Sequence, residues 1–273
     1  MLGSVRAELA KLGRRPAVWL LLCVAVSLGL TFTYLVPYAG AAGAAGGVPN
    51  GDRGLSAVLP DQLVGNSVAG LPVFLGAIAL ILGVLAVGGE YGWGTWKTVL
   101  TQGPSRLTVY AAKLVALAVA TLAGMLAMFA AGAVASGVIA AAEGEPANWP
   151  APGDLVVGIG AGWLMAGMWA VLGALLAIAL RGVALPIGLG LVWLLAVQNL
   201  LAAIAAPLLD WVARAQEYLP GPNAGSLAAA LGAGDTPGVD ALVGGGRAAV
   251  AVAVYLVVFG LLGGVLLRRR DVV

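Results

Sequence analysis

Charged residues in this chain are confined to short segments, and six long apolar runs without charge lie between them. The runs cover approximately residues 17–36, 67–88, 114–136, 155–180, 183–206 and 248–267. A transmembrane helix needs about 20 consecutive apolar residues, so each run is long enough to cross a bilayer. Soluble proteins carry roughly 25% charged residues, whereas only 10% of these 273 residues are charged. We therefore expect an all-α membrane protein, with six transmembrane helices in a single transmembrane domain over residues 1–273.

Lys and Arg gather in the segments that six spans would place on one side of the membrane. That side holds both termini, the segment between the second and third runs, and Arg181, with eleven Lys/Arg and three acidic residues. The other three connections hold three Lys/Arg and nine acidic residues, which leaves no charge inside a predicted span. Because segments rich in Lys and Arg face the cytoplasm, we expect a multi-pass protein of the plasma membrane with both termini in the cytoplasm.

The first fifteen residues predict an amphipathic helix lying at the membrane interface. Leu2, Val5, Leu9 and Leu12 recur at spacings of three and four, and charged residues occupy most of the other positions. Pro16 separates this helix from the first apolar run. That run is longer than the h-region of about 7–15 residues in a signal peptide, so we predict an uncleaved first span.

Several functional classes are disfavoured by what the sequence lacks. It has no His and one Cys, Cys23, so a Cys/His metal cluster cannot form and a nucleophile–base pair is hard to assemble. None of the three lysines, Lys11, Lys97 and Lys113, follows the Gly that a phosphate-binding P-loop requires. We therefore expect no ATPase or other enzyme activity, no cofactor or metal of the chain's own, and no nucleic-acid partner.

The polar segment 90–113 interrupts the apolar sequence between the second and third runs. Within it, Trp93, Trp96 and Leu100 recur at spacings of three and four. This spacing predicts a short amphipathic helix over residues 92–101, parallel to the membrane.

The end of this segment predicts the start of the third span. Gly103-Pro104 ends the short helix, and Ser105 is a suitable N-cap for the next one. Arg106 and Lys113 would then lie about two turns apart on the cytoplasmic start of the third span. On composition alone, the segment could also be a basic loop that sets topology and has interfacial tryptophans.

Short motifs along the whole chain resemble those of a known family. They are Glu90-x-x-x-Gly94-Thr95, Pro104-Ser105-Arg106 with Lys113, Glu8-x-x-Lys11 before Arg14-Arg15-Pro16, and Tyr218-Leu219-Pro220. As a set, these motifs resemble the signature of ABC-2-type ABC transporter permeases.

The resemblance implies a transmembrane subunit that pairs with a second permease subunit as a homo- or heterodimer. Two copies of a separate cytoplasmic ATPase, which would bind ATP and Mg, are implied to drive it, and export is the implied direction. Residues 92–101 would be a coupling helix that docks into the ATPase, braced by the N-terminal helix. The implied coupling residues are Glu90, Gly92, Trp93, Gly94, Thr95, Trp96, Lys97, Leu100, Pro104, Ser105, Arg106 and Lys113.

On this interpretation Glu90 lies at the membrane boundary, where we expect an ion pair with Arg106 or Lys113. Trp93 and Trp96 would either contact the ATPase or anchor in the lipid headgroups.

Two polar residues interrupt the fifth run, and a long polar connection follows it. Gln198 and Asn199 are expected to bond across helices or to line a translocation path, since an unpaired amide is costly there. The connection 207–247 predicts short helices, either extracellular or partly re-entrant around residues 224–231. Two other functions remain open: a membrane anchor or assembly protein without transport activity, and a secondary transporter.

Overall fold

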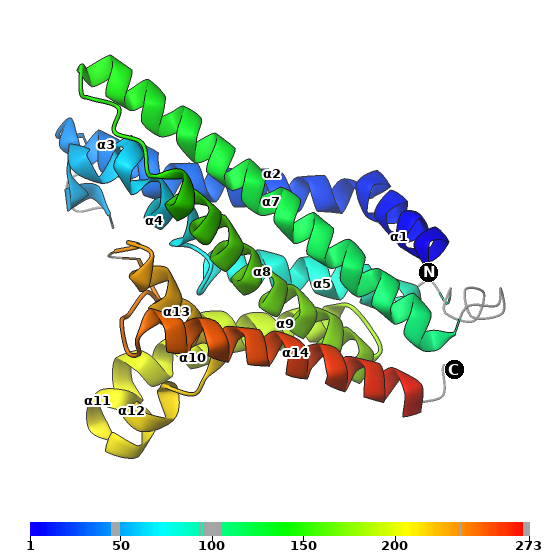
Figure 1. Cartoon of the computed structure of the whole chain (residues 1–273). Coiled ribbons are helices and arrows are strands. Elements are labelled where there is room, and N and C mark those ends of the chain that lie inside the picture. The colour runs from blue at the N-terminus through cyan, green and yellow to red at the C-terminus, as the bar shows by residue number, and fades with distance from the viewer. Residues whose placement is uncertain (45–49, 93, 95–104, 235, 270–273) are drawn as a thin grey trace.

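The computed structural model describes residues 1–44, 50–92, 94, 105–234 and 236–269, and every regular element in these ranges is helical (Figure 1). Among these residues, six helical stretches are long and apolar enough to cross a membrane. They are Pro16–Ala41, Phe74–Gly92, Arg106–Glu143, Pro152–Leu180, Ala184–Ile204 and Gly245–Arg269. The predicted all-α fold with six spans is confirmed.

The central helices of the bundle are α5 (Phe74–Gly92) and α8 (Pro152–Leu180). In each of them, 61% of the most apolar stretch is buried. Their backbones touch, because a Cβ atom on Gly83 would collide with the carbonyl of Ala170, and one on Gly173 would meet α5 in the same way. Glycine at such a crossing lets membrane helices approach closely enough to pack in the absence of a hydrophobic driving force.

The third span is the long helix α7 (Arg106–Glu143), which has 38 residues. At 1.5 Å per residue it is about 57 Å long, and it therefore exceeds the hydrocarbon core of about 30 Å. It begins at Arg106 and carries Lys113 about two turns later, so the helix starts before the charge-free run of residues 114–136. The predicted N-cap is confirmed, since the Oγ of Ser105 accepts the backbone N–H of Thr108 at 3.2 Å.

The N-terminal part of the chain forms helix α1 (Leu2–Arg14) and then the first span. Arg15 is extended, and Pro16 occupies the first position of the next helix, where its missing N–H would have no partner in any case. The first span continues as α2 (Pro16–Leu30), the π-helical turn η1 (Thr31–Leu35) and α3 (Val36–Ala41). Figure 1 shows α1 turning away from the axis of α2 at one end of the bundle.

The fifth and sixth spans lie at the periphery. The fifth is built from α9 (Ala184–Leu191), the π-helical η5 (Val192–Val197), α10 (Gln198–Leu200), the π-helical η6 (Leu201–Ala205) and α11 (Ala206–Leu208). The sixth is α14 (Gly245–Arg269). Only 17% of the most apolar stretch of each is buried. These two spans therefore present apolar side chains outward, as membrane helices do.

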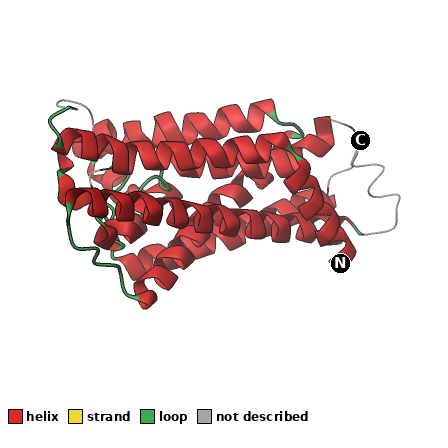
Figure 2. Cartoon of the chain, turned by 90° about the horizontal axis from the view of Figure 1, so that it is seen from above, coloured by secondary structure: helices red, strands yellow, loops and turns green. Residues whose placement is uncertain are grey.

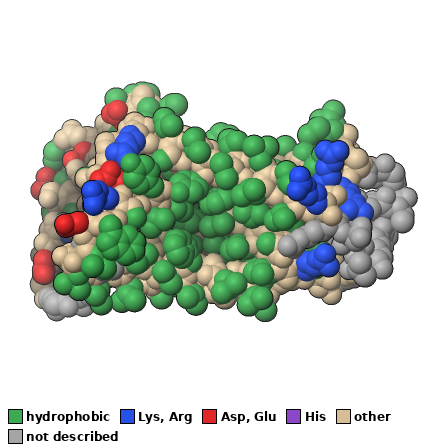
Figure 3. Space-filling model, turned by 90° about the horizontal axis from the view of Figure 1, so that it is seen from below, with side chains coloured by type: hydrophobic (Ala, Val, Ile, Leu, Met, Phe, Trp, Pro, Cys, Tyr) green, Lys and Arg blue, Asp and Glu red, His purple; other side chains and the backbone are tan. Residues whose placement is uncertain are grey.

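The N-terminal helix α1 and the last described turn of α14 lie at the same end of the bundle, which we call the terminal end (Figures 1 and 2). On the face in Figure 3, acidic side chains lie only at the opposite, far end, and hydrophobic side chains cover the middle. Lys and Arg side chains gather at the terminal end, and a few lie among the acidic ones at the far end. This arrangement agrees with the sorting of charge predicted for six spans.

Short helices lie at the far end of the bundle. They are η2 (Gly51–Arg53), η3 (Leu55–Val58), η4 (Pro60–Gln62), α4 (Leu63–Val68), α12 (Asp210–Gln216) and α13 (Pro220–Ala230). The last two provide the short helices predicted in the connection 207–247. All residues of α4 are buried, and turns at residues 69–73 separate it from α5. The second span therefore starts at Phe74 and not near residue 67, because Pro72 has no N–H to continue a helix.

Candidate functional site

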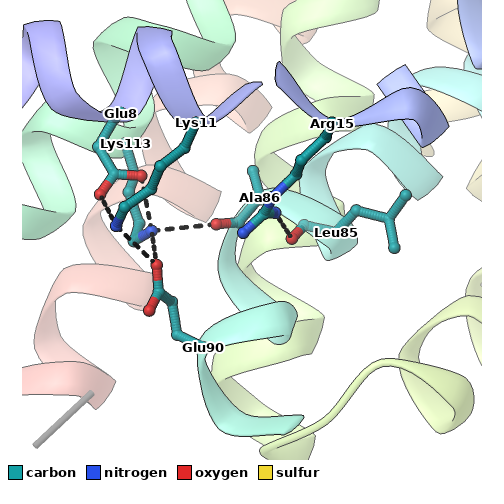
Figure 4. A network of polar contacts seen from close by, with 7 residues as sticks. All are labelled: Glu8, Lys11, Arg15, Leu85, Ala86, Glu90 and Lys113. Carbon is teal, nitrogen blue, oxygen red and sulfur yellow. Dashed lines mark hydrogen bonds and ion pairs between the residues drawn. The ribbon is translucent and has the colours of Figure 1, made fainter. Parts of the chain in front are cut away.

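Four charged side chains from three helices meet near the terminal end of the bundle (Figure 4). At the centre, the Nζ of Lys113 in α7 lies 2.8 Å from Oε2 of Glu8 in α1 and 3.0 Å from Oε1 of Glu90 in α5. The same ammonium group donates to the carbonyl oxygen of Ala86 at 3.1 Å. Lys113 is 1% exposed, Glu90 3% and Glu8 7%. These groups therefore meet almost without solvent.

Lys11 completes the cluster from the more exposed side. Its Nζ lies 2.8 Å from Oε1 of Glu8 and 3.0 Å from Oε1 of Glu90. Burial lowers the pKa of Lys11, but the hydrogen bonds and charges of the two carboxylates more than offset this, and the pKa is raised. We call Glu8, Lys11, Glu90 and Lys113 the charge cluster; its two lysines balance its two carboxylates.

Arg15 fixes the corner between α1 and α2 next to the charge cluster. Its Nη1 donates to the carbonyl oxygen of Leu85 in α5 at 2.8 Å (Figure 4). Across the same corner, the indole N–H of Trp19 donates to the carbonyl oxygen of Gly13 at 2.8 Å. The N-terminal segment is therefore attached to the second span through the Lys11–Glu90 ion pair and through the bond from Arg15 to the backbone of Leu85.

The position of Glu8 follows from the helical repeat of α1. Glu8 and Leu12 are buried, and Val5 and Leu9 are partly buried, so the packed face follows spacings of three and four. Leu2, which was assigned to the apolar face, is 81% exposed. Sequence reasoning placed Glu8 among the polar positions because of its charge, although it lies three residues after Val5 and four before Leu12, on the packed face.

The charge cluster also corrects the expectation that no charge lies inside a span. Glu90 is within α5 and Lys113 is about two turns into α7, both inside helices that qualify as membrane spans. Because an unpaired buried charge costs several kcal/mol, a lysine here requires carboxylate partners. The predicted ion pair between Glu90 and Lys113 is confirmed, and sequence reasoning missed Glu8 and Lys11 as further members of the cluster.

Most of the predicted coupling segment falls outside the described residues. This applies to Trp93, Thr95, Trp96, Lys97, Leu100 and Pro104 and hence to the helix predicted over residues 92–101. Gly92 is the last residue of α5, and Gly94 has a φ of 64° in the turn that follows. Since Arg106 is the first residue of α7, both ends of this segment lie close in sequence to the charge cluster.

The two polar residues of the fifth span have different surroundings. Gln198 is 5% exposed and packs on α13, where a Cβ atom on Gly221 would collide with its amide. Its Oε1 has no hydrogen-bond partner among the described residues. Asn199 is partly buried and donates to the carbonyl oxygen of Leu195 within its own span at 3.0 Å. The structure thus brings Gln198 against a second element, whereas the amide of Asn199 bonds within its own span.

A cavity of about 1070 Å³ opens at the far end, between the first and second spans and the short helices. Its apolar wall includes Leu28, Phe32 and Phe74, and its polar side includes Arg53 and Asp240. Cavities of this size and mixed character can hold a small organic molecule.

Comparison with known proteins connects this arrangement to a family. A search of curated proteins gives no match. A family model described as ABC-2 family transporter protein matches residues 4–197, which is more than half of the chain and includes the whole charge cluster. Proteins of this family are the permease subunits of ABC transporters, which work with a cytoplasmic ABC ATPase and have no ATPase site of their own. The chain belongs to the ABC-2 transporter family and is a multi-pass permease subunit.

Proposed function

We propose that this chain couples ATP hydrolysis by a separate cytoplasmic ATPase to export of a substrate across the plasma membrane. The observation that carries the proposal is the charge cluster, because it joins α1 to the two helices that flank the predicted coupling segment. A force applied to this segment would reach α5, α7 and α1 together.

The charge distribution supports an orientation with the terminal end in the cytoplasm. Lys and Arg dominate that end and acidic residues dominate the far end (Figure 3), as the positive-inside rule requires. Residues 92–101 would then be a cytoplasmic coupling helix, and α1 would lie at the cytoplasmic interface.

Membership of the family supports the following proposal for the partners. The complete transporter contains a second permease subunit, either identical or related, and two copies of the ATPase. ATP and Mg are bound by the ATPase. The far-end cavity would open to the outside, where an exporter releases its substrate.

The buried carboxylates of Glu8 and Glu90 are what would favour a secondary transporter, since coupling to protons needs titratable groups inside the protein. Two observations argue against that role. Both carboxylates are bound by lysines at 2.8–3.0 Å, and the cluster lies near the end of the spans instead of at mid-membrane. A membrane anchor without transport activity could bind the same ATPase, but it would not need the charge cluster to transmit motion from the ATPase to the spans.

The test is ATP hydrolysis by the chain and its ABC ATPase, purified together and reconstituted in lipid vesicles. Replacing residues 93–101 with a Gly/Ser linker should abolish association with the ATPase. Glu90→Gln should leave membrane insertion and association intact and reduce hydrolysis stimulated by the permease. Arg247→Gln, which removes an exposed ion pair with Glu217, is the matched control and should change neither.

Three results would contradict the proposal. The ATPase could bind equally well without residues 93–101. Glu90→Gln could leave coupled hydrolysis and transport at the wild-type level, which would remove the cluster from the mechanism. The purified chain alone could move substrate down an ion gradient, which would identify a secondary transporter.

A further inference from the structure

An apolar groove of about 1050 Å³ runs between α7, α8 and α14 on the side of the bundle. Its walls come from Leu107 to Ala118, Gly160 to Val171 and Leu256 to Arg268. Apart from Tyr110, Trp163 and Arg268, every lining residue is Gly, Ala, Leu or Val. The groove is thus almost entirely hydrocarbon, with one charged side chain at one end.

The two polar groups in its wall have their partners within the chain. Tyr110 donates its hydroxyl to the carbonyl oxygen of Gly260 at 3.1 Å, and the indole N–H of Trp163 donates to the carbonyl oxygen of Ala118 at 2.8 Å. An apolar occupant would therefore leave neither group unpaired. The guanidinium of Arg268 is the charged group that the groove offers to a ligand.

The length of the groove corresponds to one leaflet of a bilayer. Along α7 it runs from Leu107 to Ala118, about 16 Å at 1.5 Å per residue, and half of a 30 Å hydrocarbon core is about 15 Å. It begins at the terminal end, where α7 starts and α14 ends (Figure 1). A lipid tail fits this extent, whereas a helix of a second subunit would cross both leaflets.

The charges around its open end favour an anionic headgroup. Arg268 and Arg269 form the last turn of α14 and are both exposed. Among the described residues, the acidic side chains at this end, Glu8 and Glu90, are held by the lysines of the charge cluster. Basic residues between transmembrane helices on the cytoplasmic side are typical binding sites for anionic lipid headgroups.

We propose that this groove binds one anionic phospholipid of the leaflet at the terminal end. An acyl chain lies in the groove over Gly160 and Gly260, and the phosphate pairs with the guanidinium of Arg268. The site is separate from the charge cluster and does not depend on the direction of transport.

Native mass spectrometry of the purified full chain in detergent tests the headgroup contact, with phosphatidylglycerol and phosphatidylcholine as the probes. The wild type should retain one phosphatidylglycerol in preference to phosphatidylcholine. Arg268→Gln should reduce this preference about fivefold, the effect expected for one basic residue at the membrane surface. Arg268→Lys should keep it, and Arg269→Gln, which lies outside the groove lining, should change it less than Arg268→Gln. Equal losses in Arg268→Gln and Arg269→Gln would overturn the proposal, because they would indicate general surface charge.

A second variant tests the groove without removing a charge. A Cβ atom on Gly160 has nothing within 4 Å, so Gly160→Leu would extend into the groove without a clash. Gly188→Leu, which also has open space on an exposed face of α9, is the control. Gly160→Leu should displace the bound phosphatidylglycerol while Gly188→Leu should not. Unchanged retention in Gly160→Leu, or a change of its oligomeric state with no effect on lipid, would overturn the proposal and assign the groove to a protein partner in the second case.

Discussion

Replacing Lys113 with methionine tests whether the charge cluster is as desolvated as its geometry indicates. Methionine keeps a long unbranched side chain in the same space, so the main change is the loss of the ammonium group. Glu8 would then keep its contact with Lys11, and both carboxylates would lose the buried ammonium group that lies between them.

The expected loss follows from the burial of these groups. Removing one partner of a buried ion pair typically costs about 3–5 kcal/mol, because the remaining charge is left without its counterion. The side chain of Lys11 is 38% exposed, so water can approach the remaining carboxylates from that side. We therefore expect Lys113→Met to destabilise the protein by about 3 kcal/mol, the lower end of that range.

A double variant separates charge from packing. Glu90→Leu combined with Lys113→Met leaves Glu8 and Lys11 as a neutral pair 2.8 Å apart. Residues in one ion-pair network usually show interaction energies of about 0.5–3 kcal/mol. The double variant should therefore be clearly more stable than the sum of the two single changes predicts.

The measurement is the loss of folded monodisperse protein on heating in detergent, followed by size-exclusion chromatography. Arg247→Gln is the reference for the loss of an exposed ion pair, because the side chains of Arg247 and Glu217 are 51% and 36% exposed. Exposed pairs contribute about 0–1 kcal/mol to stability. The reasoning fails if Lys113→Met is no more harmful than Arg247→Gln, or if Glu90→Leu and Lys113→Met are simply additive.

Three further outcomes are expected from the same assay. Gly83→Ala should prevent recovery of monodisperse protein because its Cβ would collide with the carbonyl of Ala170. Gly124→Ala, with nothing within 4 Å of its Cβ, is the control and should behave as wild type. Equal recovery of the two variants would mean that α5 and α8 are not in close contact. The raised pKa of Lys11 means that its charge contributes to the stability of the folded protein. This contribution is complete below the ordinary pKa of 10.5 and is lost as the pH rises through the higher pKa of the folded protein. Lys11→Gln should remove part of this alkaline loss, and an unchanged profile from pH 9 to 12 would contradict the assignment. Ser105→Ala should cost about 1 kcal/mol through the lost N-cap, and Ser105→Asp should restore it; equal stability of both variants would show that the cap contributes nothing.

The number of spans could be predicted from the sequence because a charge-free apolar run of this length must reach the bilayer. The ends of the spans could not be predicted in the same way. The charge-free run marked only residues 114–136 as the third span, whereas α7 carries Lys113 in a buried position because carboxylates from two other helices neutralise it. Such partners are far apart in sequence and become visible only in the folded chain.

The charge cluster was predictable only in part. The spacing between Glu90 and Lys113 across one connection indicated a possible pair, and that pair is present. Glu8 lies on the packed face of α1, three residues after Val5 and four before Leu12, so a helical repeat read without regard to charge would have found it. The contact of Arg15 with the carbonyl oxygen of Leu85 has no such signal, because it depends on how α1 and α5 are placed in space.

The shared counterions limit how the helices can move. Separating α1 from α5 and α7 would pull Glu8 away from Lys113, and two unit charges 4 Å apart attract by about 4 kcal/mol at an effective dielectric constant near 20. Motion of α1 alone is therefore costly, and α1 should follow the adjoining ends of α5 and α7 as one body. At the other end of the bundle, α7 carries Gly132, where an added Cβ would lie 2.9 Å from the hydroxyl of Tyr34 in the first span and 3.0 Å from Leu63 in α4. Because one continuous helix makes both sets of contacts, a displacement of α7 at the charge cluster would also displace its contacts with the first span and α4. No hinge interrupts α7 between these two places.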